Sequence, residues 1–445
     1  MFAFKGRTGR LTYVAAALAV FFAQHLIVLA AFGLSDQALA PDWRFLVTPF
    51  GSLAHLQPAP PFIALVGVAL MLLAAWVLAV LSFRRAADAG LPGWIAAAAI
   101  APVVQIPAIL FLCMASARPE VALSEGAADP SPHFGWWSTS AQGVLAGTAV
   151  TVVAVALGAL VFGAYGYGMF VVSPFVIGAT TAFLANRTDD IGRARTLRLV
   201  GGALLLGGVA LFFVALEGAV CVVLAFPLAL GVAWVGGLCG RAIALAGRKR
   251  ASNSLMGVAL LPLVFASEAA LPPSTHFDDT ASIEVAASPS TLWRSVIHMD
   301  TIETPPALPF RLGVAYPERG EVIGQGVGAT RHGYFSTGMA TERVTEWAPG
   351  RVLAFDILTD PPTLREMSPY RHVHAPHVKG YFRTEHARIT LTPLANGHTR
   401  LALATTHTLQ LEPVLYWLPL TRWVIHENKI RVLTQMARQA EAAPR

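Results

Sequence analysis

Residues 282–293 read Ser-Ile-Glu-Val-Ala-Ala-Ser-Pro-Ser-Thr-Leu-Trp, and this stretch decides how the last part of the chain folds. Its first five residues alternate between polar and apolar side chains, which is the period of a strand with one buried face. Ser288 followed by Pro289 marks a helix start, because a serine hydroxyl caps a helix and proline is favoured at the first helical position. A strand is therefore expected to lead directly into a helix that carries Trp293.

Downstream of this stretch, strand-like runs are separated by turn signals such as Ser-Thr-Gly at 336–338 and Asn-Gly at 396–397. The predicted strands cover residues 318–323, 328–336, 339–347, 352–358, 378–393 and 399–411. A helix is predicted over residues 412–442, and its apolar positions recur at helical spacing at Leu420, Trp423, Ile430, Leu433 and Met436. Consecutive strands before a long helix predict an α+β domain in which an antiparallel sheet curves around the last helix.

Upstream of it, residues 1–272 have a different composition. They hold 25 charged side chains, 15 basic and 10 acidic, whereas residues 273–445 hold 33. The whole chain is 55% hydrophobic and 13% charged, and its mean hydropathy is +0.57. Because soluble proteins carry about 25% charged residues, these values exclude an ordinary soluble enzyme.

The apolar runs of the first part are long enough to cross a bilayer, which takes about 20 residues per helix. Eight such runs are predicted, at residues 11–33, 61–82, 93–115, 144–163, 168–185, 199–216, 219–238 and 255–271. Glu217 lies in the middle of a nearly uncharged stretch that is twice the length of one span. We therefore expect it at the aqueous turn of a helical hairpin rather than inside the membrane.

Basic residues in short loops set the expected orientation, since Lys and Arg are enriched on the cytoplasmic side. They occur at Lys5, Arg7, Arg10, Arg84 and Arg85, and again within residues 187–198 and 241–250. The N-terminus is therefore predicted to be cytoplasmic. Three candidate spans separate Arg85 from Arg187, and an odd number cannot return to the same side, so one run is re-entrant or one loop breaks the rule. Residues 248–269 have the layout of a signal-peptide core, which predicts an extracytoplasmic C-terminal domain.

Two segments carry a resemblance to a known family. Residues 2–13, Phe-Ala-Phe-Lys-Gly-Arg-Thr-Gly-Arg-Leu-Thr-Tyr, and residues 84–94, Arg-Arg-Ala-Ala-Asp-Ala-Gly-Leu-Pro-Gly-Trp, resemble domain-of-unknown-function family 805. The resemblance implies a bacterial inner-membrane protein and supplies no reaction. Ala87 departs from the family pattern, which commonly has His there. The predicted division is residues 1–118 with about three spans and residues 119–272 with about five more.

Physically, the basic residues of these two segments have two readings. Lys5, Arg7, Arg10, Arg84 and Arg85 would form a membrane-interface girdle beside anionic lipid. The alternative is that they determine topology and do nothing more.

The last part of the chain resembles the START-like superfamily, in particular its polyketide cyclase/dehydrase (SRPBCC) branch. The resemblance covers about residues 280–442 and rests on the opening strand, the Ser-Pro helix start, the buried Trp, the hairpins and the terminal helix. It implies a helix-grip fold for residues 273–445, with an apolar cavity between sheet and helix that the superfamily uses for lipids, sterols, polyketides and other hydrophobes. The superfamily has no universal catalytic motif.

An unusually large supply of aromatic side chains gives this cavity support from the residues themselves, because hydrophobe sites have mostly apolar walls. The ligand-cavity candidates are Trp293, Phe310, Tyr316, Tyr334, Phe335, Tyr381, Trp417, Trp423 and Ile430. The alternative is that these side chains only pack the core.

Histidines supply the candidate polar groups. His372, His374 and His377 are expected at the pocket mouth or in a lid, with an ordinary surface loop or a zinc site as alternatives. His426 and Glu427 are candidate catalytic acid/base residues beside the apolar stripe of the last helix, with a helix-edge hydrogen bond as the alternative. Cys113, Cys221 and Cys239 lie in apolar runs and define neither a disulfide framework nor a metal site. We expect no metal and no cofactor.

Three functions remain open from the sequence. The leading hypothesis is a membrane-tethered protein that binds a hydrophobic ligand in the helix-grip cavity, with transfer or sensing of that ligand as further options. Its partners would be the lipid bilayer and a small hydrophobic ligand. The second is an enzyme of polyketide cyclase/dehydrase type. The third is a non-catalytic regulatory or assembly protein with a collapsed cavity. No basic patch interleaved with aromatics occurs, so nucleic acid is not an expected partner. Oligomeric state and ligand identity stay open.

Overall fold

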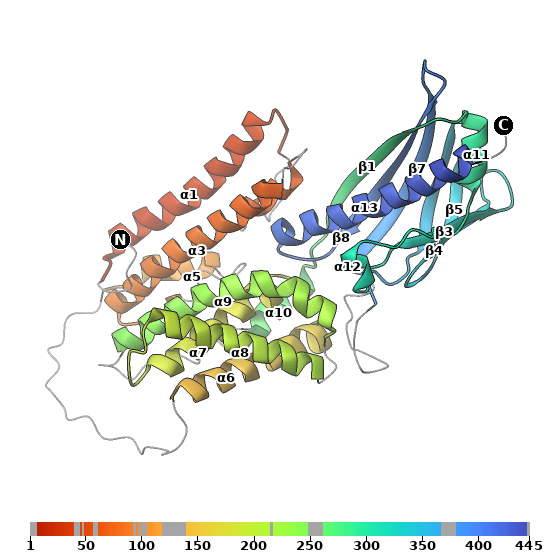
Figure 1. Cartoon of the computed structure of the whole chain (residues 1–445). Helices are drawn as coiled ribbons and strands as arrows, with labels where there is room; N and C mark the ends of the chain where they lie inside the picture. The colour runs from red at the N-terminus through yellow and green to blue at the C-terminus, as the bar shows by residue number, and fades with distance from the viewer. Residues whose placement is uncertain are drawn as a thin grey trace, which may run out of the picture. The chain divides into compact units, whose positions relative to one another are not determined.

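The computed structural model of the chain describes residues 7–39, 45–46, 49–56, 61–91, 95–96, 99, 105–117, 139–213, 217–247, 261–365 and 380–442. It divides into two compact units: the first comprises residues 1–217 and 221–272, and the second comprises residues 273–445 together with residues 218–220. The first unit is helical, and the second contains a large curved sheet (Figure 1).

The helical unit holds α1 (Arg10–Leu34), η1 (Pro49–His55), α3 (Pro61–Ala89), α5 (Gln105–Met114), α6 (Thr139–Ala156), η2 (Leu157–Phe162), η3 (Gly168–Val172), α7 (Ser173–Asn186), α8 (Arg193–Phe213), α9 (Ala219–Gly247) and α10 (Leu261–Ala270). Five helical segments are long and apolar enough to span a membrane: Arg10–Leu34, Thr139–Phe162, Gly168–Asn186, Arg193–Phe213 and Ala219–Ala246. The other three predicted runs fall on α3, α5 and α10, so the count of eight spans stays a prediction.

The ends of α1 and α3 meet where the first basic residues lie. The Thr8 amide donates to the carbonyl of Arg84 over 3.4 Å, and the Tyr13 hydroxyl bonds the buried Ser82 hydroxyl over 3.0 Å. The two helices therefore run antiparallel, with Arg10 and Arg84 at the same end.

Arg85 departs from the expectation of an interface residue, because its side chain is fully buried. Its Nε donates to the carbonyl of Leu112 over 3.1 Å, and its other nitrogens bond the carbonyl of Ala115 and the Asp88 carboxylate. The last carbonyls of a helix have no partner within it and attract cations. Arg85 therefore caps the C-terminal end of α5, which lies at the same end of the unit as the C-terminal end of α3.

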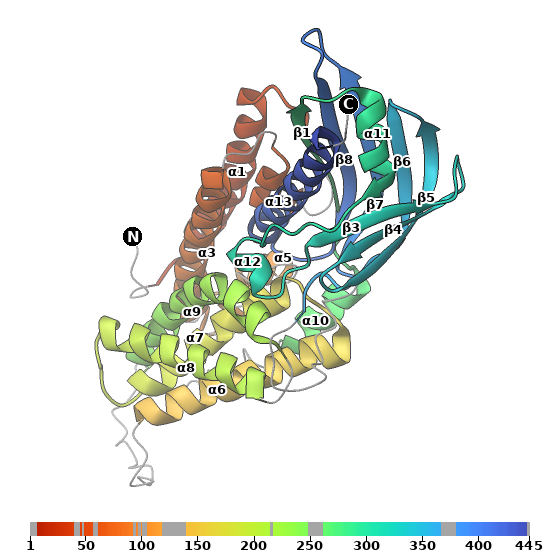
Figure 2. The ribbon, with the colours of Figure 1, turned by 45° about the vertical axis from the view of Figure 1, so that its right-hand side comes forward.

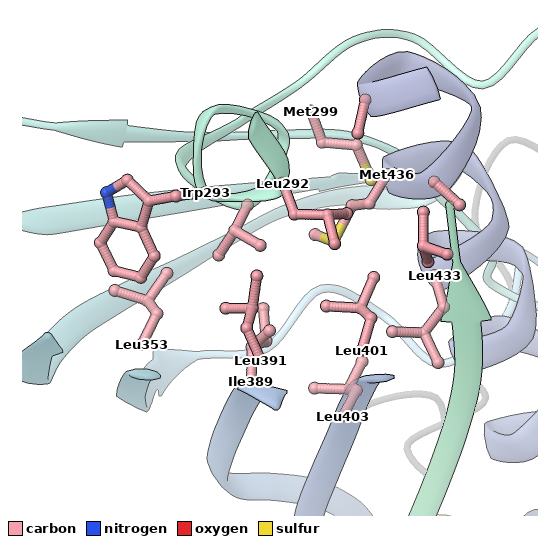
Figure 3. Close-up of a cluster of buried hydrophobic side chains, with 14 of the residues drawn as sticks. Leu292, Trp293, Met299, Leu353, Ile389, Leu391, Leu401, Leu403, Leu433 and Met436 are labelled. Atoms are coloured by element: carbon pink, nitrogen blue, oxygen red, sulfur yellow. The ribbon is translucent and has the colours of Figure 1, made fainter. Parts of the chain in front are cut away.

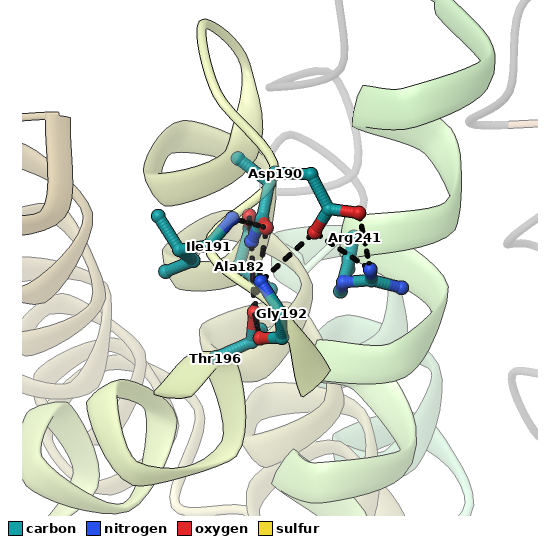
Figure 4. A network of polar contacts seen from close by, with 7 residues as sticks. Ala182, Asp190, Ile191, Gly192, Thr196 and Arg241 are labelled. Carbon is teal, nitrogen blue, oxygen red and sulfur yellow. Dashed lines mark hydrogen bonds and ion pairs between the residues drawn. The ribbon is translucent and has the colours of Figure 1, made fainter. Parts of the chain in front are cut away.

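A polar network holds the corresponding ends of α7, α8 and α9 together (Figure 4). Arg241 on α9 donates to both carboxylate oxygens of Asp190 over 2.6 and 2.7 Å, and the Gly192 amide donates to Asp190 over 2.9 Å. Buried Asn186, at the end of α7, bonds Thr196 on α8 over 3.0 Å. The basic segments 187–198 and 241–247 therefore share one end of this bundle.

The opposite end of the bundle carries the breaks between helices. Glu217 lies between α8 and α9, as predicted for a hairpin turn, and it is buried and accepts a hydrogen bond from Tyr165 over 3.0 Å. The Gly168 amide, which begins η3, donates to Glu268 of α10 over 2.8 Å. The chain therefore leaves α9 at the basic end and reappears in α10 at the other.

The second unit holds β1 (Thr275–Val285), α11 (Pro289–Ile297), β2 (His298–Met299), α12 (Leu308–Arg311), β3 (Pro317–Ile323), β4 (Thr330–Phe335), β5 (Gly338–Ala348), β6 (Val352–Thr359), β7 (Phe382–Pro393), β8 (Thr399–Leu409) and α13 (Val414–Glu441). The helix start predicted at Ser288 is confirmed, since its side chain accepts from the Thr291 amide over 3.2 Å.

The strands form one antiparallel sheet in the order β1-β8-β7-β6-β5-β4-β3-β2. The sheet curls around α13, as both views show (Figures 1 and 2). The predicted fold class, a helical membrane part followed by a helix-grip α+β domain, is confirmed in this arrangement. Burial alternates along β1 and β8, so one face of the sheet points inward toward the helix.

A dense apolar core fills the half of this interior nearest α11 (Figure 3). Leu433 and Met436 from α13 meet Leu292 from α11 and the inward leucines of the sheet, and all of these side chains are buried. Each such side chain contributes about 1.5–3 kcal/mol by leaving water. This core anchors the C-terminal half of α13 and leaves its N-terminal half for other contacts.

Candidate functional site

A pocket of about 220 Å³ lies between α13 and the segment that leads through α12. Its lining comes from Ile302, Thr304, Pro305, Pro306, Ala307 and Phe310 on one side and from Glu427, Asn428, Ile430, Arg431, Thr434, Gln435 and Arg438 on the other. Ligand pockets for drug-sized molecules measure about 300–1,000 Å³. The volume therefore suits a smaller ligand of one or two rings.

Hydrogen bonds hold the two walls of the pocket together. Arg431 donates from Nε to the carbonyl of Pro317 over 3.1 Å and from Nη2 to the carbonyl of Ile302 over 3.3 Å. Arg438 donates to the Thr304 hydroxyl over 2.7 Å. The apolar parts of the lining are thus fixed by polar contacts at the rim, which favours a pre-formed site.

Asn428 presents an unused acceptor in this pocket. Its Nδ2 donates to the carbonyl of Ala315 over 3.0 Å, which fixes the orientation of the amide. Its Oδ1 is buried and has no hydrogen-bond partner among the described residues. A buried acceptor without a partner costs about 1–3 kcal/mol, so a donor group on a bound molecule would relieve that cost.

Further along the inner face of α13, Lys429 forms a buried ion pair. Its Nζ lies 2.8 Å from Oδ2 of Asp279 on β1, and its side chain is 4% exposed. Burial lowers the pKa of Lys429, while the hydrogen bond and charge of Asp279 act to raise it. The pair places a fixed dipole on the inner side of α13.

His407 lies on β8, where it pairs with Phe277 of β1, and its side chain is 3% exposed. Its ring stacks between Phe277 and Phe382, with centroid separations of 5.2 Å to each, and its Nε2 lies 2.6 Å from the Thr405 hydroxyl. Its Nδ1 has no partner within the described part of the chain. Burial, followed by the charge of Lys429, lowers the pKa of His407 to about 3. The imidazole is therefore neutral at physiological pH.

A second buried pair lies on the inner face of β4 and β5. Arg331 bonds Glu342, and its guanidinium stacks over the Phe355 ring at 4.4 Å. Burial raises the pKa of Glu342, and the charge of Arg331 opposes that rise. Together with Lys429 and His407, this pair gives one end of the interior a polar lining.

The predicted acid/base residues lie in different environments. Glu427 is half-buried and lines the pocket, whereas the neighbouring His426 is exposed and does not line it. The predicted mouth residues His372, His374 and His377 lie outside the described residues.

Of the nine predicted cavity residues, Phe310 and Ile430 line the pocket. Trp293 packs in the core and meets Trp347 edge to face at 5.2 Å. Trp423 is 45% exposed and stacks on Phe310 at 6.4 Å. The half-buried Tyr316 meets Phe310 edge to face, and Trp417 is buried beside Tyr416.

Tyr334 departs from the cavity expectation. Its neighbours Arg331 and Gly333 point inward, so the alternation of β4 places Tyr334 on the outer face of the sheet. There its hydroxyl donates to Glu321 over 2.9 Å and its ring lies 3.5 Å from the Arg319 guanidinium. Phe335 and Tyr381 are half-buried near the ends of β4 and β7 and do not line the pocket.

Sequence reasoning missed Asp279, His407, Asn428 and Lys429. His407 falls in phase with Leu401 and Leu403 on β8, and Lys429 falls four residues before the buried Leu433 on α13. In both cases the signal is a polar side chain at a position that the repeat of the strand or helix assigns to the buried, apolar face.

The fold is that of a helix-grip domain. The pocket differs from the predicted cavity between sheet and helix, because its lining comes from α13 and the 302–310 segment and includes no strand residue. Residues 1–122 match the family model described as "Protein of unknown function (DUF805)". No curated protein matches the sequence significantly.

Solved structures similar to the chain include a protein from Chromobacterium violaceum, at 16% identity and a TM-score of 0.24, covering 37% of this chain and 98% of its own. A truncated norcoclaurine synthase from Thalictrum flavum matches at 14% identity with a TM-score of 0.24, and the match covers 39% of this chain and 97% of the synthase. The Zhui aromatase/cyclase from a Streptomyces species matches at 16% identity with a TM-score of 0.23, and the match covers 38% of this chain and 94% of the cyclase. At these values no ligand or reaction carries over to this chain.

Proposed function

We propose that this protein is a membrane-anchored binding protein whose helix-grip domain holds a small, mainly apolar ligand that carries a hydrogen-bond donor. Asn428 Oδ1 carries the proposal, because it is a buried acceptor without a partner in the described residues and Asn428 lines the same pocket as Phe310 and Ile430. A ligand hydroxyl or amine that reaches it gains a hydrogen bond that water does not supply there. The apolar body of the same ligand covers Phe310 and Ile430.

The helical unit supplies the anchor, and we propose the bacterial cytoplasmic membrane as its location, with the N-terminus cytoplasmic. Two observations support the orientation. Arg10 and Arg84 share one end of the first hairpin, and the segments at 187–198 and 241–247 share one end of the second bundle. Since α10 lies at the other end of that bundle, the helix-grip domain follows on the extracytoplasmic side.

A pair of naphthalene probes tests the ligand proposal. Both 1-naphthol and 1-methoxynaphthalene have the same ring system, and only the naphthol has a hydroxyl donor. In the detergent-solubilised full chain we expect saturable binding of 1-naphthol, seen in its fluorescence anisotropy, and about two- to tenfold weaker binding of the methoxy compound. Asn428→Leu should remove this preference.

Two further variants make the probe experiment specific to the pocket. Ile430→Trp fills the cavity and should abolish saturable binding, whereas His426→Ala, on the exposed side of the same helix, should leave it unchanged. Binding that is unaltered in Ile430→Trp would show partitioning into the detergent and would contradict the proposal.

The second candidate, an enzyme of polyketide cyclase/dehydrase type, is favoured by Glu427 alone, because this carboxylate lines the pocket. In that case Glu427→Gln would abolish turnover of a pocket ligand while 1-naphthol still binds. Loss of both together would instead indicate that Glu427 shapes the pocket.

A further inference from the structure

One end of the curved sheet receives the chain from the helical unit. β1 begins there at Thr275, paired with Leu409 at the end of β8, and Phe382 at the start of β7 pairs with the same residue. In the antiparallel order β7-β6-β5-β4-β3, the end of β4 and the starts of β5 and β3 return to this end, where Phe335 pairs with both Gly338 and Pro317. We name this the linker end, since the linker of residues 271–274 enters the domain here.

Exposed apolar side chains gather at the linker end beside the pocket. Leu308 is 70% exposed and Leu312 is 41% exposed, on successive turns of the α12 segment. Trp423 on α13 is 45% exposed, and it stacks on Phe310, which lines the pocket. Leu420 lies one turn before Trp423 and is also exposed. We call Leu308, Leu312, Leu420 and Trp423 the apolar rim.

Scattered surface leucines are ordinary, but grouped apolar side chains mark an interaction surface. Arg311 lies between Leu308 and Leu312 in the sequence and is itself exposed. Large apolar side chains interleaved with a cation form the pattern by which helices lie in the headgroup boundary of anionic bilayers. The chemistry of the rim therefore suits the surface of an anionic bilayer.

The linker fixes which surface is within reach. Residues 271–274 connect α10 to β1, and four extended residues span at most about 14 Å. α10 belongs to the unit that holds five helices long enough to cross a membrane. The linker end is therefore restrained close to the point at which the chain leaves the membrane, and this restraint does not depend on how the two units are oriented.

We propose that the apolar rim docks into the headgroup boundary of the anchoring bilayer, so that the pocket beside Phe310 opens against lipid. This inference rests on the membrane anchor of the proposed function and not on ligand binding. The bound state would let an apolar ligand pass between bilayer and pocket without crossing water.

Nitroxide labels on the full chain test the docking. In a background with Cys113, Cys221 and Cys239 replaced by Ala, Leu308→Cys or Leu312→Cys carries the label in nanodiscs of phosphatidylethanolamine and phosphatidylglycerol. The matched control is Val327→Cys, an equally apolar residue that is 69% exposed on the β3–β4 turn, at the far end of the sheet. Collision rates with oxygen, which concentrates in lipid, and with a nickel chelate, which stays in water, are measured for each.

We expect the logarithm of the oxygen-to-nickel collision ratio to be positive at both rim positions and negative at 327. A negative value at 308 and 312 would show the rim open to water and would overturn the proposal. Low collision rates with both reagents would also overturn it, because they show burial against protein, either a second copy or the chain's own helices. Two rim positions guard against a single misfolded variant, and a thermal unfolding midpoint equal to that of the cysteine-free parent verifies the fold.

The docking test and the ligand test can fail independently of each other. Asn428→Leu should keep the collision pattern of the rim while losing its preference for 1-naphthol. The failure of one proposal therefore leaves a result that the other can still meet.

Discussion

His407 shows at the level of one residue how burial sets chemistry. An imidazole of ordinary pKa near 6.5 is charged for part of its time in neutral water. Between two phenylalanine rings and near Lys429, the pKa of His407 falls to about 3, so the folded chain holds it neutral. Its role is confined to that of a neutral hydrogen-bonding group.

This lowered pKa predicts acid sensitivity with a definite sign. Between pH 6.5 and 3 the unfolded chain binds a proton at this histidine and the folded chain does not, so folding stability falls as pH falls. Through this group alone, the free energy of unfolding is expected to be about 2 kcal/mol lower at pH 5 than at pH 8. His407→Phe keeps a ring between Phe277 and Phe382 and cannot titrate. Unfolding by urea can be monitored in the full chain in nanodiscs through the hydrogen exchange of β7 and β8. The free energy of unfolding should depend less on pH in the variant than in the parent. Identical slopes would refute the assignment.

Lys429 predicts a large effect of removing one buried charge. In Lys429→Met the carboxylate of Asp279 stays largely buried without its partner, and breaking such a pair costs about 3–5 kcal/mol. Arg400→Met breaks the pair between Arg400 on β8 and Glu284 on β1, whose charged atoms lie 3.2 Å apart with both side chains half exposed. That control should lose less than about 1 kcal/mol.

The same unfolding measurement distinguishes the two positions. Lys429→Met combined with Asp279→Asn should recover part of the lost stability, because the second change removes the orphaned charge. Equal losses in Lys429→Met and Arg400→Met would mean that water reaches the buried pair.

At the scale of elements, most of the strands could be predicted from the sequence. The expected run at 352–358 is β6 (Val352–Thr359), and the predicted last helix is α13 (Val414–Glu441). Turn residues and alternation are local signals, so they survive without knowledge of tertiary contacts. The face that α13 buries was harder to predict, because the apolar stripe includes the exposed Trp423, whereas the buried face includes Lys429.

The same difference between local signals and tertiary contacts explains which residues of the candidate site could be predicted. Phe310 and Ile430 could be anticipated as pocket walls from their apolar character, but the acceptor of Asn428 exists only because Ala315, more than a hundred residues away, takes its amide. Arg85 was expected at the interface because a basic residue beside a span usually lies there. Its burial depends on the carbonyls of Leu112 and Ala115, which no local pattern reveals.

Helices α7 and α9 meet through glycines, which predicts a steep cost for adding a single methyl group. A Cβ on Gly236 would lie 2.1 Å from the carbonyl oxygen of Phe175, and one on Gly240 would lie 2.1 Å from that of Ala179. Small residues four apart let membrane helices approach closely. Gly236→Ala should therefore push the helices apart and cost about 1–3 kcal/mol.

The matched control for this packing is Gly231→Ala on the same helix, where an added Cβ meets nothing within 4 Å. Thermal unfolding of the full chain in detergent should show Gly236→Ala melting well below the parent and Gly231→Ala melting close to it. Similar melting of both variants would mean that α9 shifts freely along α7.

At the scale of the whole molecule, the capping contact of Arg85 resolves the conflict between basic loops and span count. The chain leaves α3 at Gly90 and ends α5 at Ala115 beside Arg85, so both points lie at one end of the unit. An even number of crossings, including none, therefore separates them. With two proposed spans left before Arg187, this topology would place the basic segments at 84–85, 187–198 and 241–250 on one side of the membrane, in agreement with the positive-inside rule.

Reporter fusions after Gly90, Ser116, Gly192, Gly247 and Arg445 test this topology in bacteria. A fluorescent protein that folds only in the cytoplasm should be bright at the first four positions, because each lies at an end of the helical unit that carries basic residues. Alkaline phosphatase, which needs an oxidising compartment for its disulfides, should be active only after Arg445. The pair at Gly90 and Ser116 is the decisive comparison. Opposite compartments for these two positions would require the 93–115 run to cross the membrane once, which the contact between Arg85 and Ala115 does not permit.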